Sequence, residues 1–89
     1  MKFAYDKNKS ATNKAKHDIS LEEAKELWQV PSVEVEARTI DEPRFMVIGK
    51  LNGKFYSCIY TLRGNAIRLI SARRSRKTEE EIYHEIIKT

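Results

Sequence analysis

Two glycine-containing turns constrain the fold of this chain more than any other feature of its sequence. Asn52-Gly53 joins two runs of alternating apolar and polar residues, and Asn-Gly is the strongest short signal for a two-residue hairpin loop. Gly64-Asn65 supplies a second tight turn, with glycine in the first position, as a type II′ turn requires. The sequence therefore predicts a three-stranded antiparallel meander over 44–51, 54–63 and 66–72.

The register of these turns groups arginine side chains. Two-residue loops place Thr61 between Arg44 and Arg68 on adjacent strands, with Arg63 diagonal to Arg68 on the same face. Like charges on one sheet face are destabilising, so we expect this trio to form an anion site. A slip of one residue would move Arg44 and Arg68 to the other face. The core is expected on the face opposite the trio, where the same register aligns Val47, Cys58 and Ser71.

Capping signals predict two helices before the meander. Asp6 is the expected N-cap of a helix over 7–17, and Ser20 with Glu23 forms a capping box for a second helix that ends at Pro31. The first helix has little apolar surface, only two alanines. One of its sides is polar and carries Lys9, Asn13, Lys16 and His17.

The remaining elements are short. Alternation predicts strands over 2–5 and 33–37 and a polar loop over 38–43, and Thr78 with Glu81 forms a capping box for a final helix. We expect the helices to pack on one side of the sheet, which makes the chain an α+β protein. Its 89 residues are enough for one domain, over 1–89.

Composition narrows the partners and the setting. The net charge of +4 suits an acidic partner, either nucleic acid or an acidic protein. The single cysteine, Cys58, provides neither an intrachain disulfide nor a zinc cluster and is expected in the core. The chain has no signal-peptide pattern and no apolar run of membrane-spanning length, so we expect a cytoplasmic protein without a membrane partner.

A basic run ends the last predicted strand, and it consists of Arg73, Arg74, Arg76 and Lys77. A guanidinium group binds a phosphate through two parallel hydrogen bonds, and a strand aims it at a lower entropic cost than a free tail would. The alternative is a solvated strand end that only maintains solubility.

Taken in order, many of these residues resemble a known family. They are Phe3, Tyr5-Asp6, Lys9, Asn13, Lys16-His17, Ser20 to Ala24, Arg44-Phe45, Ile48-Gly49, Tyr60-Thr61, Arg63 and Arg68 to Arg73. Together they resemble the BrnT family of toxins from bacterial type II toxin–antitoxin systems, across nearly the whole chain. Asp18 stands where that family usually has glycine, and Tyr5 stands where tryptophan is common.

The resemblance implies a RelE-like fold and a metal-independent endoribonuclease that inhibits growth. It also implies a cognate, BrnA-like antitoxin with a ribbon-helix-helix DNA-binding domain, so that operator DNA would be contacted only through the antitoxin. No cofactor and no metal are expected.

RNA cleavage without a metal requires the 2′-hydroxyl to attack the adjacent phosphorus, assisted by a base, an acid and cations. We expect His17 to be the proton shuttle, approaching the arginine trio from its helix, with Lys16 or Glu22 as alternatives for that role. The expected catalytic residues are His17, Lys16, Arg63, Arg68 and Arg73. The expected RNA-binding residues are Lys9, Asn13, Arg44 and Arg74.

Two further functions stay open from the sequence. The chain could be a noncatalytic module whose basic sheet face follows a nucleic-acid backbone, or a protein whose cations mainly hold an acidic antitoxin segment. His84, near the carboxyl end, is expected on the surface. Neither His84 nor His17 has enough suitably spaced carboxylates for a metal site.

Overall fold

The computed structural model describes residues 2–37 and 41–88 and places their strands in one five-stranded sheet. The strands are β1 (Lys2–Ala4), β2 (Ser32–Ala37), β3 (Arg44–Leu51), β4 (Lys54–Arg63) and β5 (Ala66–Arg74), in the order β1-β5-β4-β3-β2. The predicted meander is confirmed, and β2 extends it by pairing antiparallel with β3. β1 pairs in parallel with the first three residues of β5. Part of the predicted polar loop, 38–40, lies outside the described residues.

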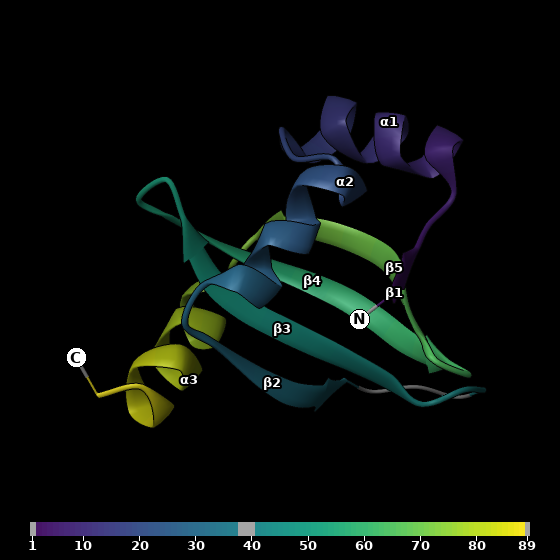
Figure 1. The fold of residues 1–89 in the computed structure, drawn as a ribbon. Coiled ribbons are helices and arrows are strands. Elements are labelled where there is room, and N and C mark those ends of the chain that lie inside the picture. Colours follow the sequence, from purple (N-terminus) through teal and green to yellow (C-terminus); the bar gives the residue numbers. More distant parts are fainter. Residues whose placement is uncertain (1, 38–40, 89) are drawn as a thin grey trace.

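Helices cover both faces of the sheet (Figure 1). One face carries α1 (Lys7–His17), α2 (Leu21–Ala24) and the 3₁₀ helix η1 (Lys25–Gln29), whereas α3 (Lys77–Ile86) lies on the other. The expectation that all helices pack on one side is therefore wrong. The reason is that the meander has apolar side chains on both faces, and a second small cluster forms around Val33, Ile48 and Tyr83.

The helix starts agree with the sequence at two of three positions. Asp6 caps α1 by accepting the backbone N–H groups of Asn8 and Lys9, and the capping box of Ser20 and Glu23 is formed. The box predicted at Thr78 and Glu81 is wrong. α3 begins earlier, with Arg76 as N-cap, and the Glu79 carboxylate accepts the Arg76 backbone N–H at 3.0 Å.

Both predicted tight turns are present. Asn52 and Gly53 have φ angles of 52° and 80°, the two positive values that a type I′ turn needs. Gly64 has φ of 58°, and the flanking residues Arg63 and Ala66 pair with each other. These turns fix the start of the register, in which Phe45 pairs with Tyr60.

A β-bulge on β5 changes the register beyond that point. Tyr60 pairs with Leu69, but Ile59 pairs with Ser71, which leaves Ile70 as the extra residue. The expected alignment of Cys58 with Ser71 is therefore wrong, and Ala72 takes that place in the core. Because one added residue reverses the side-chain alternation, the bulge also determines which way the arginines at the end of β5 point.

Helix α1 is held to its neighbours by buried polar side chains rather than apolar ones. Its buried residues are Ser10 and Asn13. Ser10 Oγ accepts the backbone N–H groups of Leu21 and Glu22, so one serine satisfies two free donors at the start of α2.

No helix among the described residues is both long and apolar enough to span a membrane.

Candidate functional site

An open hollow of about 510 Å³ lies where the end of α1 meets the end of β5 and the residues before α3. It brings together one imidazole, five cationic side chains and one carboxylate. The residues that line it are Lys14, Ala15, Lys16, His17, Asp18, Arg73, Arg74 and Arg76. Such a concentration of positive charge around an ionisable ring suits the binding and chemistry of a phosphate group.

Asn13 and Asp18 set the position of α1 at the hollow. The Asn13 amide hydrogen-bonds to both backbone groups of Ala72, one residue before Arg73. Asp18 ends α1 in a left-handed conformation, with φ of 59°. Glycine adopts this conformation without strain, and here an aspartate adopts it and makes the turn.

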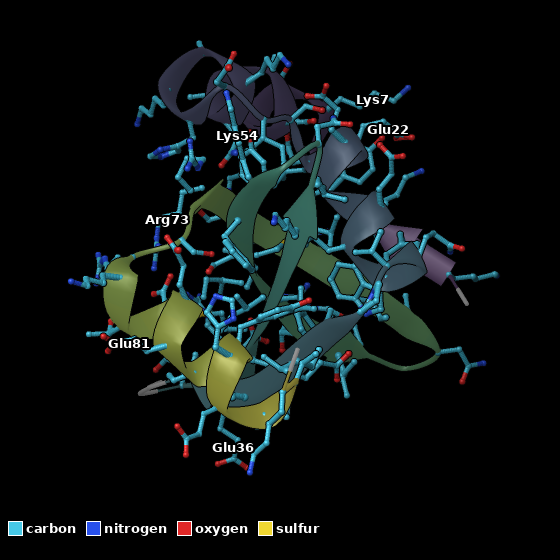
Figure 2. All side chains as sticks on the ribbon, turned by 90° about the vertical axis from the view of Figure 1, so that its left-hand side faces the viewer. Lys7, Glu22, Glu36, Lys54, Arg73 and Glu81 are labelled. Atoms are coloured by element: carbon cyan, nitrogen blue, oxygen red, sulfur yellow. The ribbon has the colours of Figure 1, made fainter. Side chains whose placement is uncertain are left out.

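Arg73 is held by the most buried ion pair of this region. The bulge pairs Arg73 with Ser57, on the α3 face, and its guanidinium donates to both Glu79 carboxylate oxygens at 2.9 and 2.8 Å. Figure 2 shows Arg73 projecting between β5 and the start of α3. The Glu79 side chain is only 9% exposed, and it also accepts from Ser57 Oγ at 2.8 Å. Burial acts to raise the pKa of Glu79, but the hydrogen bonds from Arg73, the Arg76 backbone and Ser57 outweigh it and lower that pKa to about 2.

The other cations of the hollow differ in whether a carboxylate of the protein pairs with them. Lys14 Nζ lies 2.9 Å from a Glu23 carboxylate oxygen, and this contact raises the pKa of Lys14. Arg74 is exposed; its Nε donates to the Phe55 carbonyl, and its guanidinium lies 5.8 Å from the Tyr56 ring centre. Within 2–37 and 41–88, the cations of the hollow without a carboxylate partner are Lys16, Arg74 and Arg76. Their charge is available to an anion.

The structure brings four of the predicted site residues to this hollow, and they are His17, Lys16, Arg73 and Arg74. The trio of Arg44, Arg63 and Arg68 lies at the far end of the sheet. Arg68 pairs with Thr61 as predicted, but along β5 it stands about 16 Å from Arg73, at roughly 3.3 Å per residue. The expectation that His17 approaches the trio is therefore wrong, since His17, at the end of α1, lines the hollow with Arg73, Arg74 and Arg76, and none of the trio is among the lining residues.

The remaining predicted residues have different surroundings. Lys9 is exposed on α1. Asn13 is 8% exposed, and both ends of its amide are occupied by the chain itself. Asn13 thus positions the helix, contrary to the expected contact with RNA. Arg63 lies 3.6 Å from Glu42. The backbone N–H groups of Lys9 and Asn8 lower the pKa of Asp6, and the charges of Lys9 and Arg68 add to this effect.

Sequence reasoning missed three residues of the site. Arg76 belongs to the basic run, but the sequence analysis gave it no role. Its position just before an acid-rich helix start is one where an exposed cation could have been expected. Lys14 has no sequence signal that distinguishes it from the other lysines of the same helix. Glu79 was missed because the sequence analysis placed the capping box at Thr78 and Glu81. The bulge that turns Arg73 toward Glu79 has no clear signal in the sequence.

Other reactive side chains are unsuited to chemistry here. Cys58 is fully buried, and burial raises the pKa of its thiol to about 12. His84 is exposed on α3, with its ring against Phe55. In the described part of the chain, no three His, Cys, Asp or Glu side chains converge as metal ligands.

Comparison with known proteins gives one clear finding. A family model described as the ribonuclease toxin, BrnT, of type II toxin–antitoxin systems matches residues 5–79. The match includes α1, the whole meander and the basic run, and it stops at Glu79. No curated protein matches the chain. Because the match covers most of the 89 residues, the resemblance inferred from the sequence is confirmed, and the chain belongs to the BrnT family of type II toxin–antitoxin ribonuclease toxins.

Proposed function

We propose that this chain is a metal-independent endoribonuclease that cleaves RNA in the hollow between α1 and the β5–α3 junction. The observation that supports this most directly is the meeting of His17 with Lys16, Arg74 and Arg76 in one open hollow. Proton transfer and neutralisation of phosphate charge are the two tasks of this chemistry, and the hollow contains side chains for both.

The proposed reaction begins with attack of an RNA 2′-hydroxyl on the adjacent phosphorus. His17 takes the proton of that hydroxyl or gives one to the leaving 5′-oxygen, and Lys16 is the alternative for either transfer. Arg74 and Arg76 bind the phosphate oxygens, whose negative charge grows in the transition state. Arg73 lines the same hollow, and its pair with Glu79 fixes the end of β5, so that Arg74 is positioned before RNA binds.

Metal independence is part of this proposal because each role has a candidate side chain within the protein. The test is cleavage of a short RNA by the purified chain in excess EDTA, with analysis of the product ends. A 2′,3′-cyclic phosphate end is expected, and a single 2′-deoxy substitution at the cleaved position should block the reaction. Loss of cleavage in EDTA with recovery on Mg²⁺ addition would overturn metal independence.

The arginine trio at the other end of the sheet is proposed to contact the RNA backbone. Arg44, Arg63 and Arg68 share one face and stand away from His17, so the catalytic role first expected for Arg63 and Arg68 changes to binding. Lys9 on α1 would add to the same electrostatic surface. Alanine variants of this surface should lower affinity and reduce the salt slope by about one unit for each phosphate interaction removed. Binding of RNA without any cleavage would instead support the noncatalytic alternative.

The cognate partner is proposed to be a BrnA-like antitoxin with a ribbon-helix-helix domain, which alone would contact operator DNA. The family assignment supports an antitoxin, and the basic hollow would accept an acidic segment of it. Copurification with the product of the adjoining reading frame, and loss of RNA cleavage in that complex, test this.

We also propose that the fold is RelE-like and that the protein acts in the cytoplasm, where its RNA substrate is found.

A further inference from the structure

We propose that a second hollow, next to the catalytic one, binds the nucleobase beside the cleaved phosphate and selects guanine. This inference rests on the proposed function and names the substrate of the same site. The second hollow has a volume of about 280 Å³, close to the lower end of small-molecule pockets at roughly 300 Å³. It lies between α1, η1 and the β3–β4 turn, and its lining includes Asp18, Glu26, Asn52, Lys54 and Tyr56.

The two hollows are adjacent, because Lys14 and Asp18 line both of them. A second link is Tyr56, which lines the second hollow and whose ring lies 5.8 Å from the guanidinium of Arg74 in the first. Figure 2 shows Lys54 near the tip of the hairpin, on the α1 side of the molecule. A nucleotide with its phosphate in the catalytic hollow can therefore place its base in the second.

The second hollow has a mixed charge that a backbone-binding surface would not need. Glu23 is engaged by Lys14 and by the Ser20 N–H group, but Asp18 and Glu26 have no side-chain hydrogen bond to any described residue. Carboxylates beside a phosphate site repel RNA phosphates, so they weaken non-specific binding. Carboxylates near a phosphate site are favourable when they accept hydrogen bonds from a base edge, the kind of contact that specifies sequence.

Guanine is the base whose edge fits this lining. Its Watson–Crick edge presents two adjacent N–H donors, at N1 and N2, next to the O6 acceptor. One carboxylate can accept from both donors, while the Lys54 ammonium or the Asn52 amide donates to O6. Adenine, cytosine and uracil each lack the second adjacent donor. The buried Tyr56 ring gives the hollow a rigid wall, since its side chain is held in the core.

The first test measures binding of nucleoside 3′-monophosphates to the purified full chain by calorimetry. We expect 3′-GMP to bind about tenfold or more tightly than the adenosine, cytidine and uridine compounds, the discrimination typical of a bidentate contact. Inosine 3′-monophosphate lacks the 2-amino group and should lose this advantage. The variant Asp18→Asn/Glu26→Gln should lose it too, whereas Glu36→Gln, at an exposed position on β2, should retain it.

The second test uses short RNAs that differ only in the base beside the cleaved bond. Faster cleavage at guanine, abolished in Asp18→Asn/Glu26→Gln, supports the proposal. Cleavage with no preference for guanine overturns the base site and leaves the ribonuclease function standing. A preference for 3′-GMP with no cleavage of any RNA overturns the ribonuclease function and leaves the base site. Equal binding of all four nucleotides, or a guanine preference that survives the double substitution, overturns the inference.

Discussion

The side-chain amide of Asn13 pairs with the backbone of Ala72 much as a neighbouring strand would. Its Nδ2 donates to the Ala72 carbonyl at 2.7 Å, and its Oδ1 accepts the Ala72 N–H at 3.2 Å. β1 pairs only with the start of β5, so this amide covers part of the edge that β1 leaves open. The contact fixes α1 along β5 and thereby brings His17 beside the arginines at the strand end.

Replacing Asn13 by alanine should therefore destabilise the protein. The substitution removes three buried hydrogen bonds, including one to the Ile19 carbonyl, and leaves backbone groups of Ala72 without partners. We expect a loss of about 2–4 kcal/mol in the free energy of unfolding, measured by urea denaturation. Lys9→Ala, at an exposed site of the same helix, should change it by less than about 0.5 kcal/mol. Equal effects of the two substitutions would show that the Asn13 contacts contribute little.

Asp18→Gly should raise stability. Aspartate at φ of 59° is in the left-handed region, where glycine has no steric cost, so we expect a gain of about 0.5–1 kcal/mol. Thermal unfolding provides the measurement. Asp18→Ala is the matched control, because alanine loses the carboxylate but keeps the Cβ, and it should give no gain. A stabilisation of the same size in both variants would mean that the carboxylate charge, and not the backbone conformation, is responsible.

Glu79 should make stability depend on pH in the acid range. Its pKa is about 2 in the folded protein, against an ordinary value of 4.5, so the folded state binds fewer protons than the unfolded chain between these values. The stabilisation is then complete above about pH 4.5 and is lost as pH falls toward 2. Glu79→Gln should cost on the order of 2 kcal/mol at pH 7, and this difference should shrink below about pH 4.5.

The matched control for that experiment is Glu81→Gln, on the exposed side of the same helix (Figure 2). Its unfolding free energy should follow that of the parent protein at every pH. If Glu79→Gln and the parent differed by the same amount at neutral pH and near the pKa of Glu79, the ion pair with Arg73 would not be the source of the stabilisation.

Local signals predicted the parts of this fold that are determined locally. The type I′ turn requires positive φ at both of its central residues, and Asn52 and Gly53 both tolerate that conformation. The hairpin and its register therefore follow from a few neighbouring positions. The capping box at Ser20 is equally local. The position of β1 and the side on which α3 packs depend on contacts between residues far apart in the sequence. Local sequence patterns do not predict such contacts.

The candidate site was predicted in its components but not in its assembly. His17, Lys16, Arg73 and Arg74 were identified from their chemistry, but His17 was expected beside Arg68 because its helix has little apolar surface, and the direction of Arg73 and Arg74 could not be predicted. The bulge at Ile70 reverses the alternation, so that Arg73 faces α3 and Glu79 while Arg74 lies over Tyr56. A one-residue bulge is hard to recognise in a sequence pattern, but it reverses the sheet face to which each following side chain on that strand points.

The most direct test of the proposed catalytic hollow is single-turnover cleavage of a short RNA, in excess EDTA, by three proteins. They are the parent chain, His17→Gln and Lys7→Ala, the last at the exposed first residue of α1. Removing a general acid or base should slow cleavage by about 10²–10⁴-fold, while the affinity for RNA changes little. Lys7→Ala should cleave at nearly the parent rate. A folded His17→Gln protein that cleaves as fast as the parent, or a Lys7→Ala protein that is equally slow, would contradict the assignment of this hollow as the catalytic site.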